Sequence, residues 1–369
     1  MKEYVCEFCG EALTAETCFE HDGKNMCSAC YEAKTATCVD CGVRIWRCNN
    51  AGCGHIILCS NCFDDYYTYC EECGQLIHND ETRYEDDSSD IPYCNSCYER
   101  IFESTIKGYS YKPDPIFYGK NDLFMGVELE VDIGGEENDH AESITYPANR
   151  TEERIYCKHD GSIESGFEIV SHPMTLNYHK DKMPWQKVMD KAVELGYRSH
   201  QTSTCGLHVH VGRKELGQTY EEQEDVISRI VYFVEAHWNE LLKFSRRTES
   251  NINRWARRYG LLNNTKDTYT QAKKGTDMGR YVCLNLYNPT TIEFRIFRGT
   301  LKHSTFVATL ELVHEICKRA MCTQDEEWEK MCWSDFVSKI DKEEKKTLVE
   351  YLKSKQLYVN ELNESEEDI

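Results

Sequence analysis

The sequence predicts an α+β protein in which small cysteine-rich units precede a larger domain built on a sheet covered by helices. Fifteen of the 21 cysteines lie before residue 98. Beyond residue 120, four segments alternate apolar and polar residues as β-strands do, and residues 219–247 show the apolar spacing of an amphipathic helix. A chain of 369 residues with 40% hydrophobic content can bury one large core and something smaller.

The cysteine-rich region is an internal repeat. Cys6, Cys38 and Cys70 are spaced 32 residues apart, and each opens a CxxCG phrase that a second CxxC answers. A tight CxxCG turn directs two thiolates at one point, and a second CxxC at the start of a helix supplies two more, which completes a tetrahedral zinc site. The expected zinc ligands are Cys6, Cys9, Cys27, Cys30, Cys38, Cys41, Cys59, Cys62, Cys70, Cys73, Cys94 and Cys97.

These units resemble treble-clef and LIM-type zinc fingers and are expected to fill residues 1–105. Each has too little apolar core to fold alone, so zinc affinity would supply folding free energy. The spacing leaves open whether the remaining cysteines and histidines of the region exchange into a site or form another one. They are Cys18, Cys48, Cys53, His21 and His55.

The charge of the region argues against nucleic acid as its partner. Residues 1–110 carry eight Lys and Arg against twenty Asp and Glu, a net charge of -12. Binding to a phosphate backbone depends on neutralisation by Lys and Arg, so a protein contact, delivery of a substrate or a stabilising role for the next domain is expected. No apolar run is long enough for a membrane span and the first residues lack a secretory pattern, which predicts a cytoplasmic protein.

A domain boundary is predicted where Pro113 and Pro115 interrupt regular structure, with a linker over residues 106–120. The main domain is then expected over residues 121–325, followed by C-terminal helices and an acidic tail over 326–369. Its first strand, LFMGVELEVDI, places Glu128 and Glu130 on one face. Two adjacent carboxylates repel each other unless a cation lies between them, although an acidic strand face is also common at a solvated edge.

Three later strands repeat this arrangement. The expected polar pairs are Glu164 with Glu168, His208 with His210, and Glu293 with Arg295, each opposite an apolar face suited to a helix layer. One such strand alone is weak evidence for a site, whereas four in one domain indicate a shared polar face. Residues 246–280 carry nine Lys and Arg against three acids, a composition suited to a loop that closes over a polyphosphate.

The four motifs GVELE, DGSIESGFEIVSHP, CGLHVHVG and RYVCLNLYNPTTIEFRIFRGT resemble, in order and spacing, the amidoligase family. That family is similar to glutamine synthetase and glutamate-cysteine ligase, and the match covers roughly residues 120–320. The resemblance implies a curved antiparallel sheet with helices on its convex face. It also implies an ATP-dependent carboxylate-amine ligase that uses Mg2+ or Mn2+ and forms an acyl phosphate, with an amino acid, peptide or protein as substrate.

The resemblance also implies roles for individual residues. Glu130 and Glu168, with Glu164 as a further candidate, would hold one ion, while Glu128, His208 and Glu293 would hold the ion nearest the transferred phosphate. Arg295 would steady the phosphoryl group, and His210 would be a ligand or the partner of one. The weaker candidates are Arg298 and Arg280 for the phosphoryl group, Lys274 for ATP and Asn285 for the substrate. The hydrophilic segment 134–154 is expected to be a loop that borders the substrate pocket and sets specificity.

Two other classes of function stay open. His208, His210 and Glu215 fit an HxHx4E pattern of metal-dependent hydrolases or oxygenases, although this leaves Glu128, Glu130 and Glu293 without a role. The chain can also be a non-catalytic adaptor, in which the zinc units recruit a protein and the larger domain only binds nucleotide.

Overall fold

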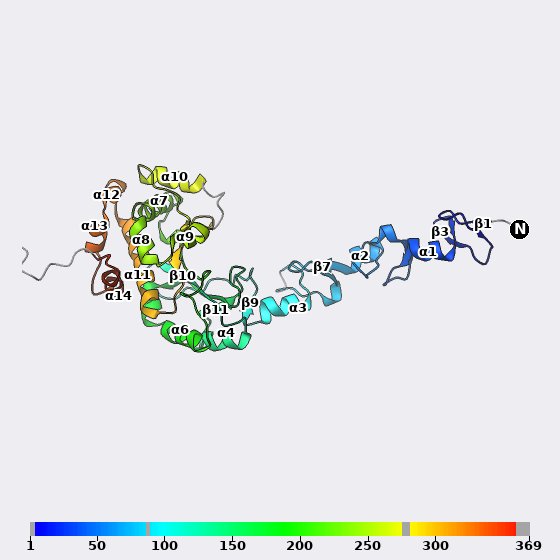
Figure 1. Ribbon diagram of the computed structural model, residues 1–369, viewed down its shortest axis with the longest axis horizontal. Helices are drawn as coiled ribbons and strands as arrows, with labels where there is room; N and C mark the ends of the chain where they lie inside the picture. Colours follow the sequence, from blue (N-terminus) through cyan, green and yellow to red (C-terminus); the bar gives the residue numbers. More distant parts are fainter. Residues whose placement is uncertain (1–3, 86–88, 275–280, 359–369) are drawn as a thin grey trace, which may run out of the picture. The chain divides into compact units, whose positions relative to one another are not determined.

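The computed structural model describes residues 4–85, 89–274 and 281–358. They form two compact units, Met1–Glu103 and Ser104–Ile369 (Figure 1). Within the described ranges, no helix is both long enough and apolar enough to cross a membrane.

The first unit consists of three similar parts, each with a short hairpin and a short helix. Its strands are β1 (Tyr4–Val5), β2 (Ala12–Leu13), β3 (Phe19–His21), β4 (Lys24–Met26), β5 (Thr35–Thr37), β6 (Arg44–Trp46), β7 (Tyr67–Tyr69) and β8 (Leu76–His78). Its α-helices are α1 (Ser28–Lys34), α2 (Ser60–Tyr66) and α3 (Asn95–Tyr98). The further helical turns are η1 (Arg47–Asn49), η2 (Asn79–Glu81) and η3 (Glu99–Glu103).

The CxxCG phrases fold as the repeat predicts. Gly10, Gly42 and Gly74 have φ angles of 78°, 72° and 68°, a left-handed conformation that glycine adopts without strain. The amide of each of these glycines donates to the carbonyl of the first cysteine in its phrase. The second CxxC of each part begins at a helix N-cap, at Cys27, Cys59 and Cys94. Both pairs of thiols are thereby turned toward each other.

The second unit is built on one sheet in the order β15-β16-β14-β10-β12-β11-β9, with β13 paired to β10. The strands are β9 (Ile106–Lys107), β10 (Phe124–Val131), β11 (Ile155–Lys158), β12 (Phe167–Ser171), β13 (Met174–Thr175), β14 (Gly206–Gly212), β15 (Leu284–Asn285) and β16 (Thr291–Arg298). All pairs are antiparallel except β9 with β11, so the sheet is mixed rather than purely antiparallel. Strand β9 also begins the sheet inside the segment expected to be a linker.

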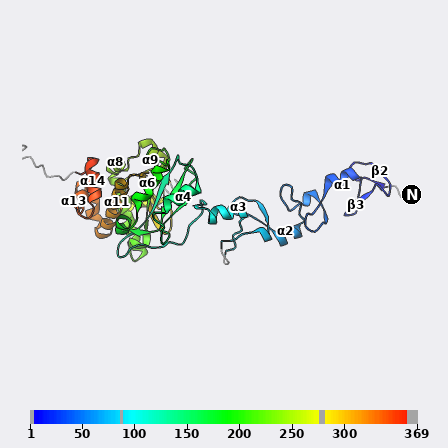
Figure 2. The same cartoon turned by 90° about the horizontal axis from the view of Figure 1, so that it is seen from below.

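The helices of this unit either cover the apolar face of the sheet or pack on other helices. They are α4 (Asn138–Thr145), α5 (Leu176–Asp181), α6 (Trp185–Glu194), α7 (Tyr220–Ala236), α8 (Trp238–Ser245), α9 (Glu249–Trp255), α10 (Thr265–Lys274), α11 (His303–Cys322), α12 (Asp325–Lys330), α13 (Trp333–Ser338) and α14 (Lys346–Ser354), with a 3-10 turn η4 (Arg213–Glu215). Helix α11 packs against α7 and α14, and both views place α8, α11 and α14 side by side (Figures 1 and 2).

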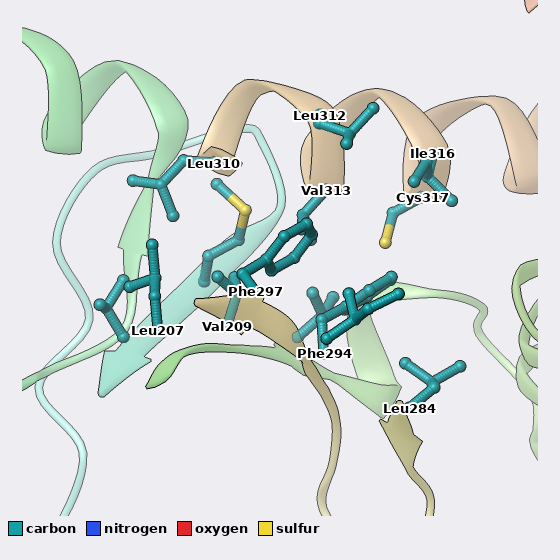
Figure 3. Packing of buried hydrophobic residues seen from close by; sticks show 14 of the residues in the cluster. Leu207, Val209, Leu284, Phe294, Phe297, Leu310, Leu312, Val313, Ile316 and Cys317 are labelled. Carbon is teal, nitrogen blue, oxygen red and sulfur yellow. The ribbon is translucent and has the colours of Figure 1, made fainter. Parts of the chain in front are cut away.

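The main core lies between α11 and the strands β14, β15 and β16 (Figure 3). Val209 and Phe294, from neighbouring strands, and Val313 of α11 are at most 1% exposed. The apolar residues that alternate with the acids and histidines therefore pack into this core and hold the polar face of the sheet in position. The buried members of the strands are Val127, Leu129, Val131, Leu207, Val209, Val211, Ile292, Phe294, Ile296 and Phe297.

Two segments differ from the sequence-based expectation. Residues 134–154 contain helix α4, because Ala141 and Ile144 are buried against the core even though the segment is mostly hydrophilic. The helix predicted over residues 219–247 is divided at His237 into α7 and α8. Thr219 and Glu222 form a capping box at the start of α7, which supplies the amide partners that its first turn lacks.

Candidate metal centre

The strand register brings the polar residues of four strands together. On β10, Glu128 lies opposite His208 of β14, and Glu130 lies opposite Glu168 of β12. On the other side of β14, His210 lies opposite Glu293 of β16. Cross-strand neighbours are about 5 Å apart at Cβ, so side chains that the sequence separates by up to 165 positions share one surface.

The first cluster of possible ligands consists of Glu128, His210 and Glu293, whose ligand atoms all lie within 4.8 Å of one another. His210 Nε2 is 3.3 Å from a Glu128 oxygen and 3.9 Å from Glu293 Oε1. His210 Nδ1 is 3.3 Å from Thr291 Oγ1, which fixes the ring and leaves Nε2 facing the two acids.

The second cluster consists of Glu130, Asp160 and Glu168, again with ligand atoms within 4.8 Å of one another. Glu130 and Glu168 are 3% and 4% exposed. Lys158 of β11 approaches from one side, with its Nζ 3.6 Å from Glu168 Oε2. Three carboxylates so close together, two of them buried, need more positive charge than one lysine provides.

His208 lies between the two clusters. Its Nδ1 is 3.2 Å from a Glu128 oxygen and 3.6 Å from a Glu293 oxygen, and its Nε2 is 3.7 Å from Glu130. The ring is 3% exposed. The sequence-based expectation grouped His208 with Glu128 and Glu293, and its Nδ1 does lie within 3.6 Å of both acids. His210 approaches the same two acids, and His208 also reaches Glu130 of the second cluster.

The electrostatics differ between the two clusters. Burial by itself raises the pKa of Glu128, but His210 and His208 hold that pKa well below its usual value. Burial likewise opposes the charge of Glu293, and His210 and Arg295 lower the pKa of that carboxyl. Although burial lowers the pKa of His210, Glu128 and Glu293 raise it overall. The negative charges of this cluster are therefore balanced within it, because the His210 imidazole carries a positive charge.

The negative charge of the second cluster is only partly balanced by nearby positive charges. Burial, then the charges of Glu128, Glu130 and Asp160, raise the pKa of Glu168 well above its usual value despite Lys158. Burial also raises the pKa of Glu130, although His208 and the Gly206 amide oppose the shift. Without a further positive charge, these carboxyls resist ionisation, which is the behaviour expected of a site that takes a cation.

A bulge in β16 shapes the wall beside the first cluster. Phe294 lies opposite Val209 and Phe297 opposite Leu207, so two residues of β16, Arg295 and Ile296, face the single His208. The extra residue leaves Ile296 in the core while Arg295 Nη1 donates to Glu293 Oε1. Bulges next to functional sites commonly re-aim a side chain in this way.

Asn285 of β15 lies beside Glu293. Its Nδ2 donates to Glu293 Oε2 at 2.8 Å, and its Oδ1 accepts the amide of Tyr287. With these two bonds Asn285 orients Glu293 within the sheet. The expected contact of Asn285 with the substrate stays a prediction.

The donor set fits a hard divalent cation. Carboxylate oxygens suit Mg2+, and an imidazole nitrogen in one cluster suits Mn2+ as well. Glu168 Oε2 and His210 Nε2 are buried, and neither has a hydrogen-bond partner among the described residues. Glu168 Oε2 faces Lys158 Nζ at 3.6 Å, and His210 Nε2 faces a Glu128 oxygen at 3.3 Å. A bound cation would take the place of the proton on His210 and add to the charge of Lys158.

Several predicted residues lie elsewhere. Glu164 is exposed at a bend before β12, which begins only at Phe167, so it does not share a strand face with Glu168. Lys274 is exposed at the end of α10, and Arg280 lies outside the described residues.

Glu215 lies in η4, and among the described residues it belongs to neither carboxylate cluster, so the HxHx4E arrangement does not form. Arg298 lies opposite Gly206 at the end of β16 and donates to the carbonyls of Arg246 and Thr202.

Sequence reasoning missed three residues of the site. Asp160 belongs to the second cluster, and the only sequence signal was the DG turn that precedes the strand with Glu168. The place of Lys158 in the site could not be predicted, because β11 is too short to show a clear alternation of apolar and polar residues. Arg247 is 7% exposed and donates to the carbonyl of Phe297, and Glu130 raises its pKa against a larger lowering by burial.

The cysteines of the first unit form three four-thiol clusters with the membership that the repeat predicts. Sulfur atoms of opposite pairs are 3.7 Å apart for Cys9 and Cys27, 3.7 Å for Cys41 and Cys59, and 3.9 Å for Cys73 and Cys94. With Zn–S bonds of about 2.3 Å, sulfurs of a tetrahedral site lie about 3.8 Å apart, so the geometry fits zinc.

The leftover ligand types lie outside these clusters. Cys18 donates to Asn25 Oδ1, and the ring of His21 packs 4.9 Å from that of Trp46. Cys48 and Cys53 are exposed, as is His55. Among the described residues, none of the five belongs to a possible metal cluster.

Three comparisons relate the chain to known proteins. A search of curated proteins finds no match. A solved structure of the complex between the prokaryotic ubiquitin-like protein Pup and its ligase PafA is similar over 58% of this chain and 52% of that one, with 9% identity and a TM-score of 0.29. The chain thus spans about half the length of that structure. The model of a family described as "Putative amidoligase enzyme" matches residues 130–317, just over half of the sequence. The chain belongs to the amidoligase family.

Proposed function

We propose that this protein is an ATP-dependent carboxylate-amine ligase that forms an amide through an acyl phosphate. The observation that carries the proposal is the pair of adjoining acidic clusters, joined by His208 and flanked by Arg295, in a chain of the amidoligase family. With divalent cations bound, such a site would neutralise the charge of a triphosphate and a carboxylate held side by side, which is the main requirement of phosphoryl transfer.

In the proposed reaction, a substrate carboxylate oxygen attacks the γ-phosphorus of ATP and ADP leaves. An amine then attacks the acyl carbon, loses a proton and displaces phosphate. Divalent cations held by Glu128, His210 and Glu293 and by Glu130, Asp160 and Glu168 would neutralise the charge of the phosphates. His208 would hold the two acidic clusters in register.

Arg295 would bind the transferred phosphoryl group. The Nη1 atom of Arg295 donates to Glu293. The Nε atom of Arg295 is buried and has no hydrogen-bond partner among the described residues, so it can donate to a phosphoryl oxygen. Although burial lowers the pKa of Arg295, Glu293 raises it, so the guanidinium stays charged. A fixed cation of this kind stabilises transition-state charge without reorganisation.

We further propose that the zinc units bind a protein partner or a protein substrate. Their net charge disfavours nucleic acid, and they expose large apolar side chains next to the CxxC turns. Phe8, Val39 and Val43 are 40%, 59% and 54% exposed. These exposed apolar side chains are available for contact with a protein.

The test is ADP release by the purified chain with ATP, Mg2+ or Mn2+, and pools of amino acids, polyamines and peptides. The proposal expects ADP release that depends on a pool and falls at least about a hundredfold in Glu293→Gln. The matched control is Glu164→Gln, which removes an exposed carboxylate outside both clusters. Metal binding without ATP cleavage in any pool would instead favour a non-catalytic adaptor.

A further inference from the structure

A second charged site lies away from both carboxylate clusters. A pocket of about 850 Å³ opens between the loop before β14, the end of β16, and helices α8, α11 and α14. Its volume is in the range of small-molecule sites. Among the described residues, six basic side chains line it and no acidic side chain does, in a protein whose net charge is -21. These residues, here called the basic pocket, are Arg198, Lys243, Arg246, Arg298, Lys302 and Lys355.

The cations of the basic pocket have no carboxylate partners. Among the described residues, none of the six forms an ion pair, whereas most other arginines of the second unit do, for example Arg154, Arg213, Arg229 and Arg258. Burial, then Arg298, Arg246 and Lys355, lower the pKa of His200 at the pocket rim, as expected where positive charges gather unopposed.

Two guanidinium groups are held in place by backbone rather than by opposite charge. Arg246 donates to the carbonyls of Arg298 and Gly299, and Arg298 donates to those of Arg246 and Thr202. The Nε atoms of both are buried, and neither has a hydrogen-bond partner among the described residues. Arg246 also caps the C-terminus of α8 in the left-handed conformation, with a φ angle of 65°.

Hydroxyl groups add to the donors. Thr300 and Thr305 line the same pocket, as do Ser199 and Ser354, whose protons are donated to the carbonyls of Glu130 and Tyr351. Guanidinium, ammonium and hydroxyl donors around one cavity match the oxygens of phosphates or carboxylates, because each oxyanion accepts several hydrogen bonds. Three negative charges would balance half of the six cations of the pocket.

We propose that the basic pocket binds a small ligand that carries several anionic groups, either phosphates or carboxylates. The site adjoins the candidate metal centre without sharing its ligands. Ser199 Oγ donates to the Glu130 carbonyl at 2.8 Å, and Arg298 lies opposite Gly206, whose amide donates to the Glu130 carboxylate. The binding of an anion here does not depend on ligase activity.

The test is isothermal titration of the full chain with inorganic triphosphate and, separately, with triglutamate, without added Mg2+. The double variant Lys302→Gln, Lys355→Gln removes two charges from the rim without disturbing the buried arginines. Binding should weaken at least about tenfold in this variant, and salt should weaken it in the wild type. The matched control is Lys346→Gln, Lys353→Gln, which removes two exposed lysines from α14 outside the pocket.

The two ligands distinguish the sources of negative charge. Tighter binding of triphosphate assigns a phosphorylated ligand, and tighter binding of triglutamate assigns an acidic peptide or polycarboxylate. In Glu293→Gln the binding should be unchanged, which separates this site from the metal centre. The proposal is overturned if neither anion binds, or if the Lys302, Lys355 variant binds as tightly as the control.

Discussion

Acid should destabilise the second unit through one buried histidine. His179 of α5 is 0% exposed. Trp185 Nε1 donates to its Nδ1 at 3.1 Å, so the proton lies on Nε2, which donates to the carbonyl of Met125 at 3.0 Å. Met125 belongs to β10, the strand that carries Glu128 and Glu130. The neutral ring therefore holds β10 in position through a hydrogen bond to its backbone.

The sign and size of the effect follow from the pKa of His179. Burial lowers it from 6.5 to about 4, and the Met125 carbonyl opposes the shift only in part. Between these two values the unfolded chain binds a proton that the folded chain does not. Stability from this group is therefore complete above pH 6.5 and is lost as the pH falls toward 4. Between pH 7.5 and 4.5 the loss is about 2.5 kcal/mol.

Urea denaturation followed by tryptophan fluorescence at several pH values measures this effect. The comparison is with His179→Gln, whose amide can donate to Met125 but does not titrate. The free energy of unfolding of the wild type should fall by about 2.5 kcal/mol more than that of the variant over this range. Equal pH dependence in the two proteins would refute the assignment of a neutral, buried imidazole.

Four further predictions concern the metal sites and the core. Asp160→Asn should weaken Mn2+ binding at least about tenfold, measured by electron paramagnetic resonance of free Mn2+, whereas Glu164→Gln should not change it. Gly206→Ala should also weaken Mn2+ binding, because a Cβ there would lie 2.5 Å from His208 Nε2; unchanged affinity would show that the strand can shift. Phe297→Ala should lower the free energy of unfolding by about 3 to 5 kcal/mol in urea titrations, since the ring is 1% exposed. A zinc chelator should release three zinc ions per chain and abolish the circular dichroism of the first unit alone, and a count below three would contradict the four-thiol clusters.

Much of the first unit could be predicted from its sequence, because its structure is determined locally. The CxxCG turn needs only a glycine with positive φ and two cysteines three residues apart, and both requirements are visible at Gly10 and Gly42. The repeat then identifies the remaining two ligands of each cluster. Cys48 and Cys53 carry no such signal, and their exposure is a property of the folded chain.

The polar face of the sheet could be predicted, but its detailed grouping could not. Alternation in β10, β14 and β16 identifies which side chains share a face, since the period of a strand is two residues. Which histidine meets which acid depends on strand register and on the bulge at Arg295 and Ile296, and neither leaves a sequence pattern. The sequence therefore could not show that both His208 and His210 approach Glu128 and Glu293.

The error at Glu164 has a related cause. The segment around it has enough apolar residues to suggest a strand, but the chain turns until Phe167. Gly166 lies so close to the backbone of Val131 that a Cβ would be 2.0 Å from its carbonyl oxygen, which fixes where β12 can begin. Asp160, held by the preceding turn, reaches the cluster that Glu164 was expected to join.

Trapping of an activated acyl group tests the central proposal most directly. Hydroxylamine replaces the amine, and the chain is incubated with ATP, Mg2+ and pools of carboxylic acids and acidic peptides. The account predicts a hydroxamate formed in equal amount with ADP, and its loss in Arg295→Gln and Glu293→Gln but not in Glu164→Gln. ADP release without any hydroxamate, or hydroxamate that persists in Glu293→Gln, would contradict ligase chemistry at this metal centre.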